Sequence, residues 1–282
     1  MERRLSGLIK GVSGSLLLAG TLLAPVALPA QEAIRIGGTG AALGPLSRLA
    51  AAYQRRSQDI AIVVTHSLGS SGGIKAVAEG ALEIGLSSRP LTDDERQRGL
   101  VAREFCRTPF VLAAGQRVKT DGLTLPEVVR IYRGEMAAWP DGERIRVVLR
   151  PASESDTAVV RGLSPECAAA VDIALKREGM LMALTDQENA DLLEKTPGAV
   201  GFLGLAQLIT EQRRLQVLAL EGIRPAEKGA VNRNYPHRKP LYLVTRERPS
   251  PATARFLAFV ASPEGRRILE EAGAIPAAAP LP

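Results

Sequence analysis

Hydroxyl groups, glycines and arginines gather at four places where a β-rich run of the sequence gives way to an amphipathic run. One of these stretches, Gly69–Gly73, has the sequence GSSGG and follows the β-rich run 60–64. A strand-to-helix junction presents free backbone N–H groups at the positive end of a helix dipole, which suits an anion. The other three junctions are Thr39–Pro45 (TGAALGP), Ser87–Arg89 (SSR) and Arg150–Thr157 (RPASESDT).

The fourth junction is the only one with an arginine at the end of the strand and hydroxyl groups at the start of the helix. Arg150 closes a strand predicted over residues 144–149, and Ser155 and Thr157 precede a helix predicted from Ala158. Arginine is well suited to bidentate contact with an oxyanion. The junctions together therefore predict that a small anion is bound by hydrogen bonds.

The stretch Gly69–Gly73 also fits the G-x-S-x-G pattern of serine hydrolases, with Ser71 as the nucleophile. His237 lies downstream with several aspartates in between, so the chain order Ser, Asp, His is possible. However, a five-residue pattern arises easily by chance in a turn rich in glycine and serine. Too few strands precede the pattern for the sheet of an α/β-hydrolase. Binding without catalysis is therefore the first hypothesis, and a secreted serine hydrolase is an alternative.

The net charge and the numbers of cysteines and histidines indicate which kinds of ligand to expect. The chain has 36 lysines plus arginines against 30 aspartates plus glutamates, a formal net charge of +6. This mild excess fits a small anion, whereas no basic run with interleaved aromatic residues predicts nucleic-acid binding. Two cysteines and two histidines, all far apart in sequence, predict no metal site, and no cofactor is expected. Cys106 and Cys167 either form a disulfide or stay as two separate buried thiols.

The first thirty residues predict a secretory signal peptide. Arg3, Arg4 and Lys10 form a positive segment, and the apolar segment 12–28 leads to a cleavage site after Ala30. The apolar segment is short and contains glycine and proline, which argues against a membrane anchor. Cleavage would remove three basic residues and one acidic residue, which lowers the formal net charge to +4. The expected location of the mature protein is the periplasm.

Strands and helices alternate along the rest of the chain, which predicts an α/β fold. Strands are predicted at 34–38, 60–64, 84–86, 105–114, 144–149, 199–202 and 239–245. Helices are predicted at 45–55, 74–82, 123–132, 251–261 and 263–271, and from residue 158. Pro45 is expected at the start of its helix, and Thr92 is expected to cap a helix with acidic residues in its first turn.

Four motifs, in this order, resemble those of the phosphate-binding proteins of bacterial phosphate ABC transporters. They are Gly69–Gly73, Ser87–Leu91 (SSRPL), Leu125–Trp139 (LPEVVRIYRGEMAAW) and Ser262–Gly265 (SPEG). The resemblance covers nearly all of the chain after the predicted signal peptide. It implies a type II periplasmic binding protein, in which two α/β lobes are joined by two crossing strands and the ligand binds in the cleft between the lobes.

The resemblance also implies how the chain is divided. The expected parts are a signal peptide at 1–30, lobe 1 at 31–112 and 241–282, and lobe 2 at 113–240. The two crossings are expected near Phe110–Ala114 and Leu241–Thr245. The junctions near the chain ends would then lie on lobe 1 and face the junction Arg150–Thr157 on lobe 2.

Residues that touch the anion are implied in the same way. The implied ligand residues are Gly40, Ala41, Ser70, Ser71, Gly72, Ser88, Arg89, Arg150, Ser155, Asp156 and Thr157. Ser88 stands where the family has an aspartate in the cleft, and Asp156 stands where the family has a glycine. Because a carboxylate can accept a hydrogen bond from protonated phosphate, we expect Asp156 to have taken over the role of the missing aspartate.

Structural alternatives for several of these residues stay open. Ser70 and Ser71 could be helix-capping residues, Asp156 could be an N-cap that faces solvent, and Arg89 could lie at the surface or bridge the lobes. In the first loop, the backbone of either Gly40-Ala41 or the following two residues could supply the N–H groups.

The expected function is the capture of inorganic phosphate, or of a related oxyanion, for the permease and ATPase of an ABC importer. No chemistry on the ligand is expected, and the expected form is a monomer. Besides the hydrolase, a secreted two-lobed binding protein without a role in transport remains an alternative.

Overall fold

The computed structural model describes residues 32–57, 59–227 and 229–278, so the predicted signal peptide lies outside the described residues. The described part belongs to one compact unit, Gln31–Pro282. No helix in this part is long and apolar enough to span a membrane.

The elements in chain order are β1 (Glu32–Gly38), α1 (Gly40–Gln54), β2 (Ile60–Ser67), α2 (Gly69–Ala78), β3 (Ile84–Ser87), α3 (Asp93–Gln97), β4 (Leu100–Gly115), β5 (Gly122–Leu123), α4 (Leu125–Arg133), β6 (Arg146–Leu149), α5 (Ser155–Arg161), α6 (Pro165–Lys176), β7 (Leu181–Met182), α7 (Asp186–Lys195), β8 (Ala199–Gly204), α8 (Leu205–Thr210), β9 (Leu215–Val217), β10 (Ala219–Leu220), β11 (Ala226–Glu227), β12 (Ala230–Val231), β13 (Arg238–Arg246), α9 (Pro251–Ala261), α10 (Pro263–Glu271) and β14 (Ile275–Pro276).

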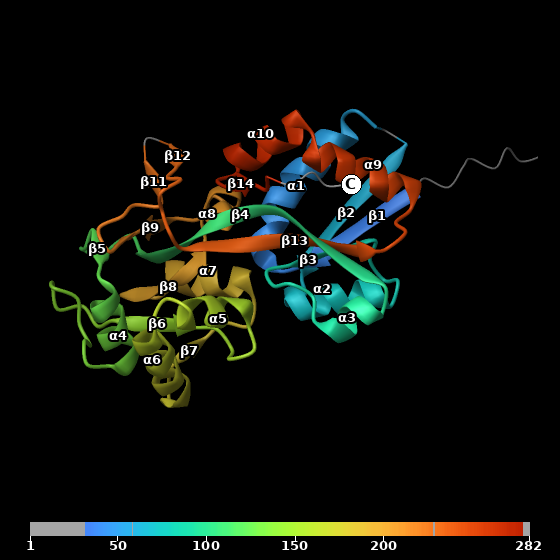
Figure 1. Ribbon diagram of the computed structural model, residues 1–282. Helices are drawn as coiled ribbons and strands as arrows, with labels where there is room; N and C mark the ends of the chain where they lie inside the picture. The colour runs from blue at the N-terminus through green and yellow to red at the C-terminus, as the bar shows by residue number, and fades with distance from the viewer. Residues whose placement is uncertain (1–31, 58, 228, 279–282) are drawn as a thin grey trace, which may run out of the picture. The chain divides into compact units, whose positions relative to one another are not determined.

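A mixed sheet of ten strands runs through the unit (Figure 1). The strand order is β2-β1-β3-β13-β4-β8-β6-β7, and β9 and β14 also pair with β4. β1 pairs in parallel with β2 and β3, and β6 pairs in parallel with β7 and β8. β13 and β4 pair antiparallel with each other. Parallel neighbours require crossover connections such as helices, and the predicted α/β fold class is confirmed.

The long strand β4 belongs to two halves of this sheet. Its residues Leu100–Pro109 pair with β13, whereas Phe110–Ala114 pair with β8. We call lobe 1 the part whose cores pack around β1, β2, β3 and β13, and lobe 2 the part whose cores pack around β6 and β8. In Figure 1, α2 and α3 accompany β3 of lobe 1, and α4, α5 and α6 accompany β6 of lobe 2.

Alternation along β4 places a hydrophobic core on each face of the sheet in lobe 2. Phe110, Leu112 and Ala114 belong to one core, whereas Val111 and Ala113 belong to the other. Successive strand residues point to opposite faces. The continuous apolar run of this segment is therefore what a strand covered on both faces requires.

The chain passes between the lobes just ahead of the positions that the resemblance implies. Phe110 and Tyr235 belong to a lobe 2 core, and Tyr235 Oη donates a hydrogen bond to Phe110 O at 3.1 Å. Cys106 and Leu241 belong to a lobe 1 core. The two crossings therefore lie side by side between these pairs of residues, and the expected crossing segments were placed slightly too late in the chain.

Three helices begin earlier than predicted, and each takes the residues of a predicted loop as its first turn. α1 begins at Gly40, α2 at Gly69 and α5 at Ser155, three to five residues ahead of the predicted starts. These predictions were wrong because they followed apolar periodicity. The first turn of a helix has N–H groups without intrahelical partners, so polar and small residues are well tolerated there. Pro45 consequently lies inside α1 and not at its start.

The N-cap predicted at Thr92 is confirmed. Thr92 accepts a hydrogen bond from the backbone N–H of Glu95, and the Glu95 carboxylate accepts one from the backbone N–H of Thr92. This reciprocal capping box satisfies two donors that would otherwise lack partners. Ser262 caps α10 with a single bond of the same kind, from the N–H of Gly265.

Both cysteines are free within the described part of the chain, so the disulfide alternative was wrong. Cys106 lies in a lobe 1 core and Cys167 lies in a lobe 2 core. Burial raises the pKa of both thiols, that of Cys106 well above its usual value. Each thiol therefore acts as a small apolar side chain.

Candidate functional site

Lobe 1 contributes three buried hydroxyl groups that are linked by hydrogen bonds. Ser70 Oγ, in the first turn of α2, accepts a bond of 2.9 Å from the backbone N–H of Ser88. Ser88 Oγ donates a bond of 3.0 Å to Thr39 Oγ1. All three side chains are buried. Because β1, β2 and β3 are parallel, the residues that follow them meet at one sheet edge, which brings three predicted junctions together.

Lobe 2 contributes Arg150, which follows β6 and is 7% exposed. Its Nη1 donates to Ala183 O at 3.1 Å, and its Nη2 lies 3.3 Å from Glu154 Oε2. Its Nε is buried and has no hydrogen-bond partner among the residues that the structure describes. Leaving a buried donor without a partner costs about 1–3 kcal/mol. This atom is therefore available to an acceptor on a ligand.

A buried ion pair connects lobe 2 with the start of β13. Lys239 is fully buried, and its Nζ contacts Oδ1 of Asp156 in the first turn of α5. Oδ2 of Asp156 is buried without a hydrogen-bond partner in the described chain. Burial opposes the charge of Lys239, but the carboxylates of Asp156 and Asp186 outweigh it, so its pKa is raised. The ammonium group is therefore charged at neutral pH.

Asp186, the first residue of α7, is not among the residues predicted from the sequence. Its Oδ1 lies 3.7 Å from Lys239 Nζ, and its Oδ2 accepts a hydrogen bond of 3.4 Å from Thr39 Oγ1 on lobe 1. Burial opposes its ionisation. The charge of Lys239 and hydrogen bonds from the backbone of Gly40 and Ala41 nevertheless hold its pKa below the usual value. Asp186 is therefore an ionised carboxylate between the lobes.

Only one of the two residues that sequence reasoning missed carried a usable signal. Asp186 follows Thr185, the N-cap of α7, and an aspartate at the start of a helix is ordinary. Lys239, by contrast, shares a strand face with Leu241 and Leu243, which are buried. A lysine in register with buried leucines indicates a buried charge that needs partners.

Ser71 and Arg89 form hydrogen bonds outside this cluster. Ser71 is exposed, and its Oγ accepts a bond of 3.1 Å from Arg89 Nη2. The Arg89 guanidinium also forms two bonds to the Glu95 carboxylate, at 2.8 and 2.9 Å. A guanidinium cannot serve as a general base. The surroundings of Ser71 therefore do not support the serine hydrolase alternative.

The remaining predicted residues of lobe 2 lie in the first turn of α5. Thr157 is buried, and its hydroxyl is within bonding distance of two carbonyl oxygens, those of Arg150 at 3.0 Å and Pro151 at 2.8 Å. Ser155 is partly buried. On lobe 1, Gly72 is partly buried in α2, one turn from the helix start. Ligand contact by these three residues stays a prediction.

The space beside the buried charges is small. Arg150, Asp156 and Thr157 border a cavity of about 20 Å³. The other walls of this cavity are Tyr132, Val148, Leu149, Val160, Val171, Leu175 and Phe202. Such a volume holds about one water molecule. All of these walls belong to lobe 2, so a larger ion would enter this cavity only if the side chains of lobe 2 moved apart.

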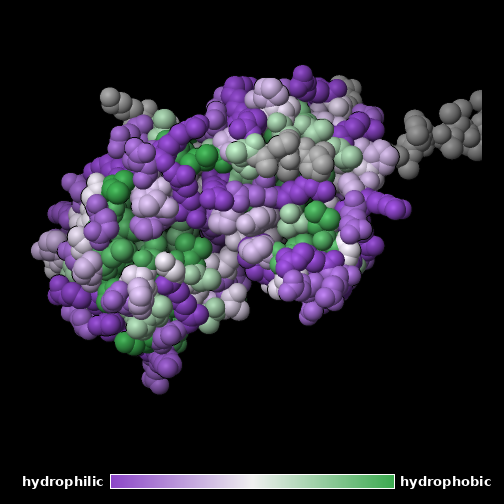
Figure 2. Space-filling view, viewed as in Figure 1, coloured by the Kyte–Doolittle hydropathy of each residue, from purple (hydrophilic) through white to green (hydrophobic). Residues whose placement is uncertain are grey.

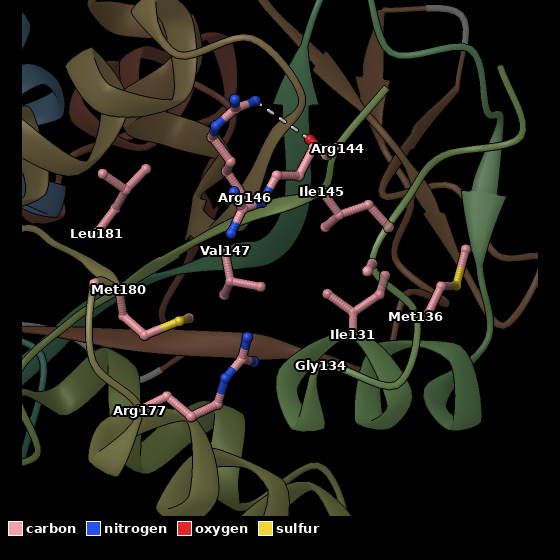
Figure 3. Close-up of a pocket in the computed structure, with 12 residues that line it drawn as sticks. Ile131, Gly134, Met136, Arg144, Ile145, Arg146, Val147, Arg177, Met180 and Leu181 are labelled. Carbon is pink, nitrogen blue, oxygen red and sulfur yellow. Dashed lines mark hydrogen bonds between the residues drawn. The ribbon is translucent and has the colours of Figure 1, made fainter. Parts of the chain in front are cut away.

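A separate pocket of about 220 Å³ lies at the opposite end of β6 (Figure 3). Arg144, Arg146 and Arg177 line it together with Met180 and other apolar residues, and the Arg177 guanidinium points into it. Figure 2 shows hydrophobic residues gathered over the region of α4, β6 and α6, within a largely hydrophilic surface. Arg146 and Arg150 are four strand residues apart, roughly 13 Å. This pocket is therefore distinct from the buried cluster.

Comparisons with known proteins place the chain in a superfamily of binding proteins. A model of the PBP superfamily domain matches residues 25–264. The phosphate-binding protein PstS of Borreliella burgdorferi is 22% identical over 86% of this chain and 89% of that protein. PstS of Bacillus subtilis is 25% identical over 73% of this chain and 68% of that protein.

A solved structure has the same fold. It is a protein from Clostridium perfringens, described as a phosphate ABC transporter substrate-binding protein and solved with bound phosphate. The TM-score is 0.73 at 21% identity, over 87% of this chain and 100% of that chain. The match shows that the two lobes and the shared sheet form the fold of a periplasmic binding protein.

Proposed function

The chain belongs to the PBP superfamily, and we propose that it captures inorganic phosphate between its two lobes for an ABC importer. The names of two relatives and of one structural neighbour support phosphate as the ligand. The site residues, the permease partner, the periplasmic location and the monomeric state belong to the same proposal. No chemistry on the ligand is part of it.

The observation that carries this proposal is a pair of buried polar atoms with opposite hydrogen-bonding character. Arg150 Nε is a donor and Asp156 Oδ2 is an acceptor, and neither has a partner within the described residues. Phosphate near neutral pH offers acceptor oxygens and at least one O–H donor, so one ligand could satisfy both atoms. Sulfate has no proton to donate and would leave the carboxylate unsatisfied.

The hydroxyl groups of lobe 1 would complete the binding. Ser70 Oγ accepts a bond from Ser88, which leaves its own proton free to donate to a ligand oxygen. Arg150 and Lys239 would supply positive charge from the other side. Contact of one ion with both lobes would stabilise the closed arrangement, and the permease would recognise that arrangement.

Titration calorimetry of the purified protein with phosphate, sulfate and molybdate tests the proposal. We expect phosphate to bind at one site per chain and sulfate to bind at least tenfold more weakly, about 1.4 kcal/mol. Equal binding of sulfate would remove the role of Asp156 as proton acceptor. Failure of all three anions to bind would contradict the proposed function as a whole.

A further inference from the structure

The N-terminus of α1 is the place where the sequence predicts backbone N–H groups for the ligand. In the structure, the carboxylate at this place belongs to the chain itself. Thr39 Oγ1 donates to Asp186 Oδ2 at 3.4 Å. The backbone of Gly40 and Ala41 also helps to hold the pKa of Asp186 below its usual value. A carboxylate with two oxygens and a negative charge thus fills a cradle that suits an oxyanion.

The fit between α7 and α1 leaves no room for a second anion there. A Cβ atom added to Gly40 would lie 2.7 Å from Asp186 Cβ and 2.9 Å from Asp186 Oδ2. The neighbouring Gln187 Nε2 donates to Gly40 O at 3.2 Å. Thr39, Ala41 and Asp186 are each no more than 3% exposed. The first turns of α1 and α7 therefore pack against each other and cover each other.

The opposite oxygen of this carboxylate faces the buried lysine. Asp186 Oδ1 lies 3.7 Å from Lys239 Nζ, which also contacts Asp156. With Arg150, the buried charges are two cations and two carboxylates, and Glu154 adds a partly buried carboxylate beside Arg150. A further anion would add unpaired negative charge in a place where that is costly. Exchange of one anion for another would leave the net charge unchanged.

From this geometry we infer that Asp186 is an internal anion, which occupies the α1 cradle, connects the two lobes and must leave before a ligand anion can bind in the cradle. The identity of the competing ligand rests on the proposed function, whereas occupation of the cradle does not. A closed empty state that excludes the ligand reduces the apparent affinity by the fraction of protein that it occupies. Asp186 thereby sets the affinity for the ligand without contacting it in the bound state.

The reverse role is that Asp186 accepts a hydrogen bond from the bound ligand. The two roles predict opposite results. Removing a competitor strengthens ligand binding, whereas removing a ligand contact weakens it. Because both oxygens of Asp186 already have partners in lobe 1 or in Lys239, the competitor role is the one that the contacts favour.

Hydrogen exchange without ligand tests the occupation of the cradle directly. The first N–H groups of a helix have no intrahelical partner, so the inference requires that Asp186 protects the Gly40 and Ala41 amides. We expect protected amides in the full-length wild type and at least about tenfold faster exchange in Asp186→Ala and Asp186→Asn. Unchanged exchange in both variants would overturn the inference.

The matched control is Glu188→Gln, because Glu188 is an exposed acid in the same helix and its loss changes the net charge equally. Exchange of the β4 amides monitors whether each variant remains folded. Glu188→Gln is expected to leave the Gly40 and Ala41 amides protected. Loss of their protection in this control as well would overturn the assignment to Asp186.

Calorimetry with inorganic phosphate then tests the competition. We expect the two Asp186 variants to bind phosphate about fivefold or more tightly than the wild type, and Glu188→Gln to bind like the wild type. Weaker binding by Asp186→Asn in a folded protein would overturn the competitor role. If no variant binds phosphate while the exchange results hold, the internal anion stands and the proposed phosphate function fails.

Discussion

Single residues between the lobes act as one electrostatic unit. Arg150, Lys239, Asp156 and Asp186 are buried, and Lys239 contacts both aspartates while Arg150 contacts Glu154. Breaking a buried pair leaves a charge without its partner, which costs about 3–5 kcal/mol. Substitutions in this cluster therefore change stability as well as binding, and each binding measurement needs a matching unfolding measurement.

Arg150→Ala is expected to weaken phosphate binding by about 2–5 kcal/mol, because it removes a buried cation whose Nε has no partner in the described chain. Calorimetry gives the affinity, and thermal unfolding shows whether the variant is folded. Arg144→Ala is the control, since Arg144 is an exposed arginine just before the same strand. A folded Arg150→Ala protein with unchanged affinity would remove Arg150 from the site.

Asp156→Asn is expected to weaken phosphate binding and to strengthen sulfate binding. An amide group can donate to a sulfate oxygen, whereas a carboxylate repels an anion that has no proton to share. Competition calorimetry with both anions measures the change in selectivity. Asp172→Asn, an exposed aspartate in lobe 2, is expected to alter neither affinity. Unaltered selectivity in Asp156→Asn would identify Asp156 as a structural partner of Lys239 alone.

Glycine residues allow neighbouring secondary-structure elements to pack closely beside the site. The stretch GSSGG forms the first turns of α2, and only some of its glycines face other backbone. A Cβ atom at Gly73 would lie 2.7 Å from Gly38 Cα and 2.9 Å from Gly37 O. Backbone atoms cannot yield as a flexible side chain can. Gly73 therefore sets the distance between α2 and β1, and with it the position of Ser70.

Gly73→Ala is expected to lower the free energy of unfolding by about 1–3 kcal/mol, because the added methyl group overpacks this contact. Gly72→Ala is the matched control. Its Cβ would meet a single neighbour, Leu68 Cβ at 3.1 Å, and alanine is the better helix former. Urea unfolding measures the free energy of unfolding of both variants, and equal values would contradict the role given to Gly73.

The turn after β3 is held by the contact of Arg89 with Glu95. This contact lowers the pKa of Glu95 to about 2. A carboxylate with a lowered pKa in the folded state contributes stability that is present above its ordinary pKa and lost as the pH falls towards the lowered value. Glu95→Gln should therefore lower stability at pH 7 but less at pH 3.

The magnitude expected for Glu95→Gln is at most about 1 kcal/mol, because this pair is partly exposed and screened by solvent. Urea unfolding at pH 7 and pH 3 measures the difference. Glu79→Gln removes an exposed acid of lobe 1 and provides the control. A loss of stability that is equal at both pH values would show that the effect comes from packing and not from ionisation.

One sheet runs through both lobes, but each lobe has its own hydrophobic cores. β4 pairs with β13 in lobe 1 and with β8 in lobe 2, so the lobes share a strand but not a core. Motion of the lobes would therefore bend β4 and its neighbour near the crossings. The cysteines illustrate the separation, because each lobe buries one of them.

Thiol titration is expected to detect no reactive cysteine in the native protein and two in the unfolded protein, without any reductant. Burial keeps Cys106 and Cys167 protonated and inaccessible. A reducing agent should likewise leave the unfolding temperature unchanged. Absence of thiols in the unfolded, unreduced protein would instead establish the disulfide that the structure excludes.

Local patterns in the sequence determined the class of fold and many of its elements, whereas α6, α7 and α8 were not predicted. Apolar runs identified the strands around β4 and β13, and Thr92 and Ser262 predicted helix starts, because these signals depend on neighbours a few residues away. The strand-to-helix junctions also identified Ser70 and Arg150, since strand ends in a parallel sheet converge at one edge. The resemblance placed these junctions on two lobes, and the match to the family confirms the fold.

Only the tertiary structure decided how the charges are paired. In the sequence, Asp186 is an ordinary first residue of a helix and Lys239 is an ordinary strand residue. In the folded chain, α7 packs against α1 and places Asp186 beside Thr39, and α5 and α7 place two carboxylates beside Lys239. These contacts join residues 83 and 147 positions apart. No short pattern encodes a separation of that size. The partners of a buried charge depend on which elements pack together, and packing is a property of the whole chain.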